Sequence, residues 1–130
     1  MRFGIVEDNR EDFVALCRVL GPDHEISRWQ SAEQVIAAFR TGGADELSML
    51  FVDCNLPGVD GIELVRQLRT FPGGDEAKIA MFSGSTDPDV SERALEAGVD
   101  RFETKGASID DFKASVARCL TVVKDAPDLL

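Results

Sequence analysis

Residues 48–58, SMLFVDCNLPG, decide the fold of this chain of 130 residues. The run from Met49 onward is apolar without alternation, which is typical of a strand covered on both faces, as in a parallel sheet. The run ends abruptly in Asp53, and Pro57 and Gly58 then fit the two central positions of a type II turn. The stretch therefore predicts a buried strand with a carboxylate at its tip and a turn into the next helix.

The same strand-then-helix pattern occurs five times along the chain. Residue patterns predict strands over 2–7, 24–29, 48–53, 77–83 and 101–105. A capping residue and an apolar repeat of helical spacing follow each strand, and the caps are Asn9, Ser31, Asp60, Asp87 and Ser108. Five such units predict an α/β fold, with a parallel sheet, helices on both faces and right-handed crossovers.

Composition narrows the class of protein. Hydrophobic residues make up 44%, which is typical of a globular domain, and we expect one domain over 1–124 with a tail over 125–130. The formal charge of -10 disfavours direct binding to nucleic acid. No apolar run approaches the ~20 residues that span a bilayer, and the N-terminus lacks a signal-peptide core. We therefore expect a cytoplasmic protein with no membrane partner. Three cysteines without CxxC spacing predict neither a disulfide framework nor a zinc site.

Polar side chains collect where four of the five predicted strands end. The first strand ends in Glu7 and Asp8, the third in Asp53, the fourth in Ser83 and the fifth in Lys105. The second strand is the most polar, as an edge strand tends to be, and ends in nothing comparable. Ligands of open α/β sheets bind beyond the carboxyl ends of the strands. If the strand order is 2-1-3-4-5, these side chains therefore converge on one pocket.

Such a pocket is equipped for phosphoryl transfer. Three carboxylates repel one another unless a cation compensates, and Mg²⁺ accepts carboxylate, carbonyl and phosphate oxygens. Asp53 could attack a phosphoryl group in line, while Lys105 and Mg²⁺ neutralise its oxygens. The Ser83 hydroxyl and the backbone N–H of Gly84 could complete the shell.

Five segments resemble the receiver domain of bacterial two-component response regulators. They are IVEDN (5–9), FVDCNLPGVDG (51–61), IAMFSGS (79–85), AGVDRF (97–102) and TK (104–105), in order across nearly the whole chain. The resemblance implies a doubly wound, flavodoxin-like (βα)5 fold whose five-stranded parallel sheet has the order 2-1-3-4-5. It also implies a signalling module, not an enzyme.

The resemblance assigns the chemistry of the pocket residue by residue. Asp53 is the expected phosphoacceptor. Asp8 is expected to bind Mg²⁺ directly, Glu7 through water, and Asn55 through its backbone carbonyl. Lys105 corresponds to the lysine that pairs with the phosphoryl group.

The resemblance also implies a switch and partners. Ser83 is expected to move to the phosphoryl group, and Phe102 is the expected switch aromatic that turns inward. The output surface would be the fourth helix, fifth strand and fifth helix. The upstream partner would be a histidine kinase or a histidine phosphotransfer protein, and the downstream partner an unidentified protein. We expect a stand-alone or excised domain that is monomeric at rest, with dimerisation through the output surface as the alternative after phosphorylation.

Three positions depart from the family pattern. Gly106 follows Lys105 where the family usually has proline, which predicts a freer loop. Phe102 stands where tyrosine is frequent, and Glu7 replaces the more usual aspartate. Because of Gly106, a degenerate receiver that docks without phosphorylation stays an alternative function.

Two other classes of protein share parts of the pattern. An Asp-nucleophile phosphatase of the haloacid dehalogenase type would often carry an acid two residues after Asp53, where this chain has Asn55. A flavodoxin-like flavin protein would place its phosphate loop after the first strand, whereas FSGSTDP (82–88) follows the fourth. The receiver interpretation therefore fits the residues best.

Overall fold

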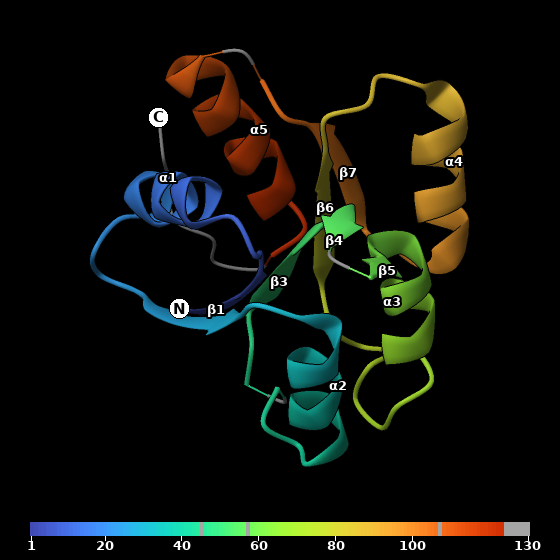
Figure 1. Ribbon diagram of the computed structural model, residues 1–130. Coiled ribbons are helices and arrows are strands. Elements are labelled where there is room, and N and C mark those ends of the chain that lie inside the picture. The colour runs from blue at the N-terminus through green and yellow to red at the C-terminus, as the bar shows by residue number, and fades with distance from the viewer. Residues whose placement is uncertain (45, 57, 107, 124–130) are drawn as a thin grey trace.

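The computed structural model describes residues 1–44, 46–56, 58–106 and 108–123. Five parallel strands form its main sheet in the order β2-β1-β3-β6-β7 (Figure 1). Because β4 and β5 belong to a separate hairpin, this order is the predicted 2-1-3-4-5. The strands of the main sheet are β1 (Arg2–Val6), β2 (Glu25–Trp29), β3 (Met49–Asp53), β6 (Ile79–Ser83) and β7 (Arg101–Thr104).

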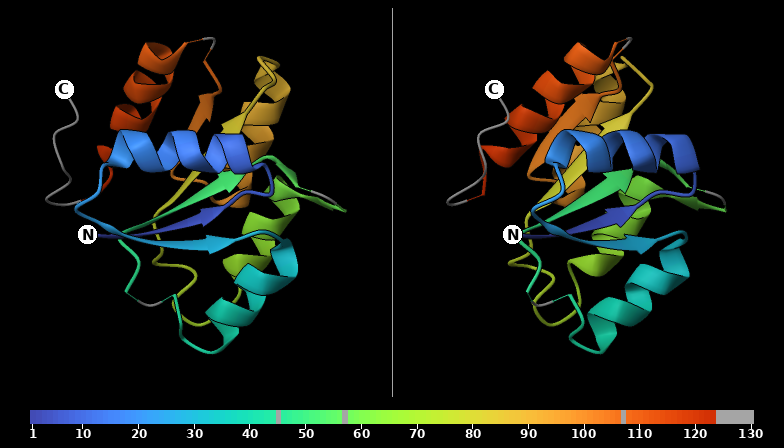
Figure 2. Two further views of the ribbon diagram at one scale, coloured as in Figure 1. Left: turned by 60° about the vertical axis from the view of Figure 1, so that its left-hand side comes forward. Right: turned by 90° about the vertical axis from the view of Figure 1, so that its left-hand side faces the viewer.

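Helices cover both faces of this sheet (Figures 1 and 2). One face carries the first and last helices, and the other carries the three between them. The helices are α1 (Arg10–Leu20), α2 (Ala32–Arg40), α3 (Gly61–Leu68), α4 (Pro88–Ala97) and α5 (Ile109–Leu120). Among the described segments, no helix is long and apolar enough to cross a membrane.

The sheet divides the apolar core into two clusters. Leu50 and Val52 of β3 pack with side chains of α2, α3 and α4, whereas Met49 and Phe51 pack with side chains of α1 and α5. All five residues of β3 are buried. The lack of alternation in MLFV is thus explained, because successive side chains enter different clusters that both exclude water.

All five predicted capping residues begin helices. Their side-chain oxygens accept backbone N–H groups at the helix starts, as capping requires. The predicted positions of the helices along the chain are therefore confirmed.

Two features differ from the predicted pattern, and two predicted segments lie outside the described residues. Asn55–Leu56 and Val59–Asp60 form a short antiparallel hairpin, β4 and β5, beyond the arrowhead ends of the main strands (Figure 2). Gly58 has a φ of 74°, as the third position of the predicted type II turn requires, but Pro57 lies outside the described residues, so the turn type stays a prediction. The fourth strand of the main sheet begins at Ile79, not at residue 77. The predicted tail over 125–130 also lies outside the described residues.

Arg69 explains the late start of that strand. Its guanidinium donates to the carbonyls of Gly74 (2.7 Å), Ala77 (2.6 Å) and Gly98 (3.0 Å) and pairs with Asp100 at 3.1 Å. The Ala77 carbonyl is therefore bound by an arginine and not by a neighbouring strand. This cluster, which we call the Arg69 clamp, joins the loops that precede β6 and β7, at the end of the sheet opposite the predicted pocket.

Candidate functional site

Three carboxylates gather at the predicted pocket. One oxygen of each of Glu7, Asp12 and Asp53 lies within 4.8 Å of the others. Glu7 follows β1 and Asp53 ends β3, and these strands are neighbours with Val6 opposite Val52. Both residues are buried, with 6% of the surface of Glu7 and 7% of that of Asp53 exposed. Asp12 reaches the same point from the first turn of α1, so these three residues could hold a cation together.

Lys105 brings one positive charge to this cluster. Its ammonium lies 3.0 Å from Asp12 Oδ2, 3.4 Å from Asp53 Oδ2 and 3.7 Å from Glu7 Oε1. Its backbone N–H donates to the carbonyl of Ser83 at 2.7 Å, which fixes the start of the side chain. Burial would lower the pKa of Lys105, but the hydrogen bond to Asp12 and the nearby carboxylates raise it above its ordinary value. Lys105 is therefore an ammonium at neutral pH.

Glu7 is the residue whose protonation the site changes most. Burial, a hydrogen bond with Asp53 and the charge of Asp53 raise the pKa of Glu7 to about 8. Lys105 and the N–H of Asn9, 3.3 Å from Glu7 Oε2, act in the opposite direction but do not cancel the increase. The single ammonium of Lys105 thus does not neutralise the three carboxyl groups. In the absence of a metal, a proton on Glu7 reduces the negative charge of the cluster.

The tip of β3 is fixed by its own backbone surroundings. The N–H of Asn55 donates to Asp53 Oδ1 at 3.1 Å, and the N–H of Cys54 donates to the carbonyl of Phe82 at 2.9 Å. Gly61, the first residue of α3, lies against this tip: a Cβ there would be 2.4 Å from the Asp53 carbonyl oxygen. The orientation of Asp53 thus depends on a glycine eight positions further along the chain.

Ser83 and Phe102 lie on the neighbouring strands. Ser83 is buried at the end of β6, where its hydroxyl accepts the N–H of Ser85 at 3.0 Å, and it lines a groove of about 400 Å³ with Asn55 and Arg93. Phe102, on β7, is half-buried against the core on the α2, α3 and α4 side of the sheet.

The structure brings together three of the seven predicted site residues. Glu7, Asp53 and Lys105 are in mutual contact range, as the strand ends predicted. Asp8 is exposed and lies outside the carboxylate cluster, while its backbone carbonyl accepts a hydrogen bond from Arg28 at 3.4 Å. The roles predicted for Asp8 and for the carbonyl of Asn55 therefore stay predictions.

Asp12 was not predicted. Asn9 Oδ1 accepts the N–H of Asp12 at 3.1 Å, so Asp12 occupies the third position of α1. The signal was present in the sequence, since an acidic residue three positions after a helix cap lies one turn into the helix. A helix that starts directly after Glu7 and Asp8 presents that turn to the same strand end.

The structure gives a reason for glycine at position 106 that the family pattern did not suggest. A Cβ at this position would lie 2.4 Å from the Cβ of Asp111 and 3.3 Å from the backbone of α5. Gly106 is therefore packed against α5, with less room than the absence of proline predicted.

The amino-acid sequence is similar to those of known proteins over most of its length. The sequence matches the response regulator receiver domain family over residues 3–117. Response regulator RppA of Synechocystis is 29% identical over 105 residues, which cover 81% of this chain and 44% of RppA. The phosphate regulon regulatory protein PhoB of Rhizobium meliloti is 34% identical over 82 residues, which cover 63% of this chain and 35% of PhoB. The chain thus spans less than half the length of these relatives.

Solved structures agree in fold. The phosphorylated cyanobacterial phytochrome response regulator RcpA superposes with a TM-score of 0.82 at 20% identity, over 98% of both chains. The Mn²⁺-bound response regulator Rcp1 gives a TM-score of 0.79 at 21% identity, over 98% of this chain and 99% of Rcp1. At these identities the likeness shows the fold alone.

The packing of Gly61 predicts a large effect of a small substitution. Gly61→Ala places a methyl group on the Asp53 carbonyl, so we expect the free energy of unfolding to fall by about 3 kcal/mol. Urea denaturation measures it. Gly84→Ala is the matched control, because a Cβ at Gly84 meets no atom within 4 Å, and should change stability by less than about 0.5 kcal/mol. Equal stability of the two variants would contradict the assigned packing.

The raised pKa of Glu7 predicts a pH dependence of stability in metal-free buffer. Between its ordinary pKa of 4.5 and about 8, folded Glu7 keeps a proton that the unfolded chain has lost. Stability should therefore decrease as pH rises through this window, by on the order of 5 kcal/mol. Urea denaturation in EDTA at several pH values measures this slope.

Glu7→Gln should flatten that slope, because the amide does not titrate. The exposed Glu11→Gln variant serves as the control and should keep the wild-type slope. A Glu7→Gln variant with the wild-type slope would show that another group titrates.

Proposed function

The chain belongs to the receiver domain family of response regulators, and from this premise we propose that Asp53 accepts a phosphoryl group in a Mg²⁺-dependent reaction that switches a protein-binding surface. The observation that carries the proposal is the position of Asp53. It is a buried carboxylate at the tip of the central strand, grouped with two further carboxylates and 3.4 Å from an ammonium.

The donor set of the site fits a hard divalent cation. All candidate ligands are oxygens, and carboxylate and carbonyl oxygens are the ligands that Mg²⁺ prefers. Glu7, Asp8, Asp53 and the carbonyl of Asn55 would hold the ion in this proposal. The ion would supply neutralising charge for the phosphoryl oxygens.

The residues of the chain itself perform the other tasks of the transfer. The upstream donor in this proposal is a phosphohistidine of a histidine kinase or a histidine phosphotransfer protein. As a bond forms between an Asp53 oxygen and phosphorus, the P–N bond breaks and the imidazole keeps its electron pair. The N–H of Asn55 holds Asp53 Oδ1 and so orients the carboxylate. Lys105 offers its ammonium to the transferred oxygens.

The register of the sheet supports a switch made of Ser83 and Phe102. Ser83 lies opposite Thr104, and Phe102 lies opposite Met81, two residues back along the same pair of strands. Ser83 and Phe102 are therefore close neighbours on adjacent strands. In this proposal Ser83 moves to the phosphoryl group, and Phe102 fills the space that opens.

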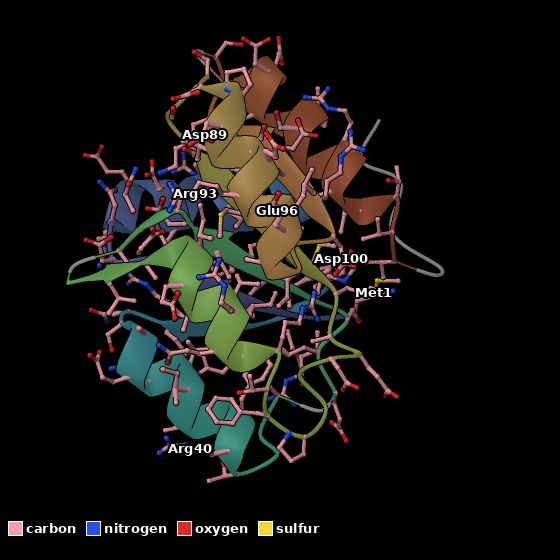
Figure 3. The ribbon with its side chains drawn as sticks, turned by 90° about the vertical axis from the view of Figure 1, so that its right-hand side faces the viewer. Met1, Arg40, Asp89, Arg93, Glu96 and Asp100 are labelled. Atoms are coloured by element: carbon pink, nitrogen blue, oxygen red, sulfur yellow. The ribbon has the colours of Figure 1, made fainter. Side chains whose placement is uncertain are left out.

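The proposed output surface consists of α4, β7 and α5. Figure 3 shows α4 with Asp89 near its start, Arg93 in its middle and Glu96 near its end. Leu95 of α4 is 53% exposed, which gives the surface an apolar contact among charged ones. We propose that a downstream protein binds here, that residues 1–124 form the receiver, and that the domain is monomeric before phosphorylation.

The direct test is intact mass spectrometry after incubation with acetyl phosphate. We expect one added phosphoryl group on the wild-type chain in the presence of Mg²⁺ and none in EDTA. Asp53→Asn should remove the adduct, whereas Asp75→Asn, which changes an exposed carboxylate in the α3–β6 loop, should retain it. An adduct that persists in Asp53→Asn would contradict the assignment.

A folded protein that binds Mg²⁺ could also take no phosphoryl group, either from acetyl phosphate or from a phosphohistidine protein. That result would favour the degenerate receiver that docks without phosphorylation.

A further inference from the structure

Lys105 forms an ion pair with a carboxylate that has no part in the proposed phosphoryl transfer. Of its three carboxylate neighbours, Asp12 is the nearest, at 3.0 Å, and Asp53 and Glu7 are further away. Asp12 belongs to α1, an element that otherwise supplies none of the proposed catalytic groups. The closest ion pair in the site therefore connects Lys105 to a residue that the proposed phosphoryl transfer does not use.

The position of Asp12 is built into the start of α1. Its N–H is held by the cap Asn9 at 3.1 Å, and the N–H of Phe13 donates to the Asn9 carbonyl at 3.1 Å. Asp12 also lies in the first turn of α1, near the positive end of the helix dipole. The backbone of Asp12 is thus held at the edge of the site independently of Lys105.

An apolar cavity lies beside this ion pair. It has a volume of about 240 Å³ between α1 and α5, and Leu16, Phe82 and Phe112 line it together with Asp12 and Lys105. On this side the ammonium has apolar neighbours, so the carboxylates supply its polar contacts.

We propose that Asp12 is a positioning residue for Lys105. It holds the ammonium between α1 and Asp53 before phosphorylation, and it competes with the phosphoryl group for that ammonium afterwards. The inference rests on the proposed function of Asp53 and adds a residue that sets how strongly the site retains its phosphoryl group.

The burial of the three carboxylates decides which contact Lys105 gives up. An ammonium has three donors, and three carboxylates surround it in the resting site. The side chain of Asp12 is 45% exposed, whereas those of Asp53 and Glu7 are 6% and 8% exposed. Water can replace the ammonium at Asp12 but not at the buried pair. A phosphoryl group therefore takes Lys105 from Asp12, and the lost ion pair weakens its binding.

The expected size of this effect is modest. Lys105 and Asp12 are both partly exposed, and such ion pairs are weak because water screens them. Removal of the Asp12 carboxylate should therefore strengthen binding of a phosphoryl group by about threefold. If Asp12 served instead as a metal ligand, its removal would weaken binding, so the sign separates the two roles.

Beryllofluoride, which imitates a phosphoryl group on a carboxylate, provides the test. Its dissociation constant is measured by isothermal titration calorimetry with saturating Mg²⁺, and ¹⁹F NMR verifies the bound species. We expect Asp12→Asn to bind about threefold more tightly than the wild type. Asp12→Glu should remain near the wild-type value, because it keeps the carboxylate. Glu11→Gln removes an exposed charge from the same helix turn and should change nothing.

The same substitution in a chain that lacks the Lys105 ammonium shows whether Asp12 acts through Lys105. In Lys105→Met, the further change Asp12→Asn should leave the dissociation constant unaltered. A gain as large as in the wild-type background would show a direct effect of charge and overturn the proposal. Unchanged or weaker binding by Asp12→Asn alone would also overturn it. A wild-type chain that binds no beryllofluoride with Mg²⁺ would instead refute the proposed function of Asp53, and the inference with it.

Discussion

The need to stabilise two buried carboxylates with one ammonium governs the architecture of this receiver domain. Glu7 and Asp53 end adjacent strands at the core of the sheet, where water is scarce and charge repulsion is strong. Lys105 follows β7, which is separated from β3 by β6. The observed parallel order places these strand ends at one end of the sheet and so brings the ammonium within reach of both carboxylates.

The two-sided core explains why the charges lie at that edge. Helices cover both faces of the central strands, so β3 and β6 have no exposed face on which a polar side chain could reach water. The carboxyl ends are the first positions where the backbone leaves the apolar layers. Gly61 and the β4–β5 hairpin then redirect the chain closely enough to keep Asp53 at the pocket.

Much of this arrangement could be predicted from the sequence. The unbroken apolar run before Asp53 indicated a strand buried on both faces, and the five caps placed the helices, because both signals are local. The strand order came from the resemblance to receiver domains, and the structure confirms it. Convergence of Glu7, Asp53 and Lys105 followed from that order alone.

Features that depend on contacts between distant segments were missed. The β4–β5 hairpin is too short to show periodicity, and the start of β6 depends on Arg69, which binds the Ala77 carbonyl from another element. Asp12 was missed because its cap predicts where α1 begins but not which partner the first turn meets.

The Arg69 clamp has a mechanical consequence for α4. The clamp holds the Gly98 carbonyl just after the end of this helix, while the helix start at Asp87 lies on the side of the pocket that contains Asp53. A rigid helix that is held at one end and displaced at the other rotates about the held end. In the proposed switch, a displacement that begins at Ser83 would therefore grow smaller along α4 toward Gly98. The first turn of α4 would then move more than its last turn and give a partner the larger change to detect.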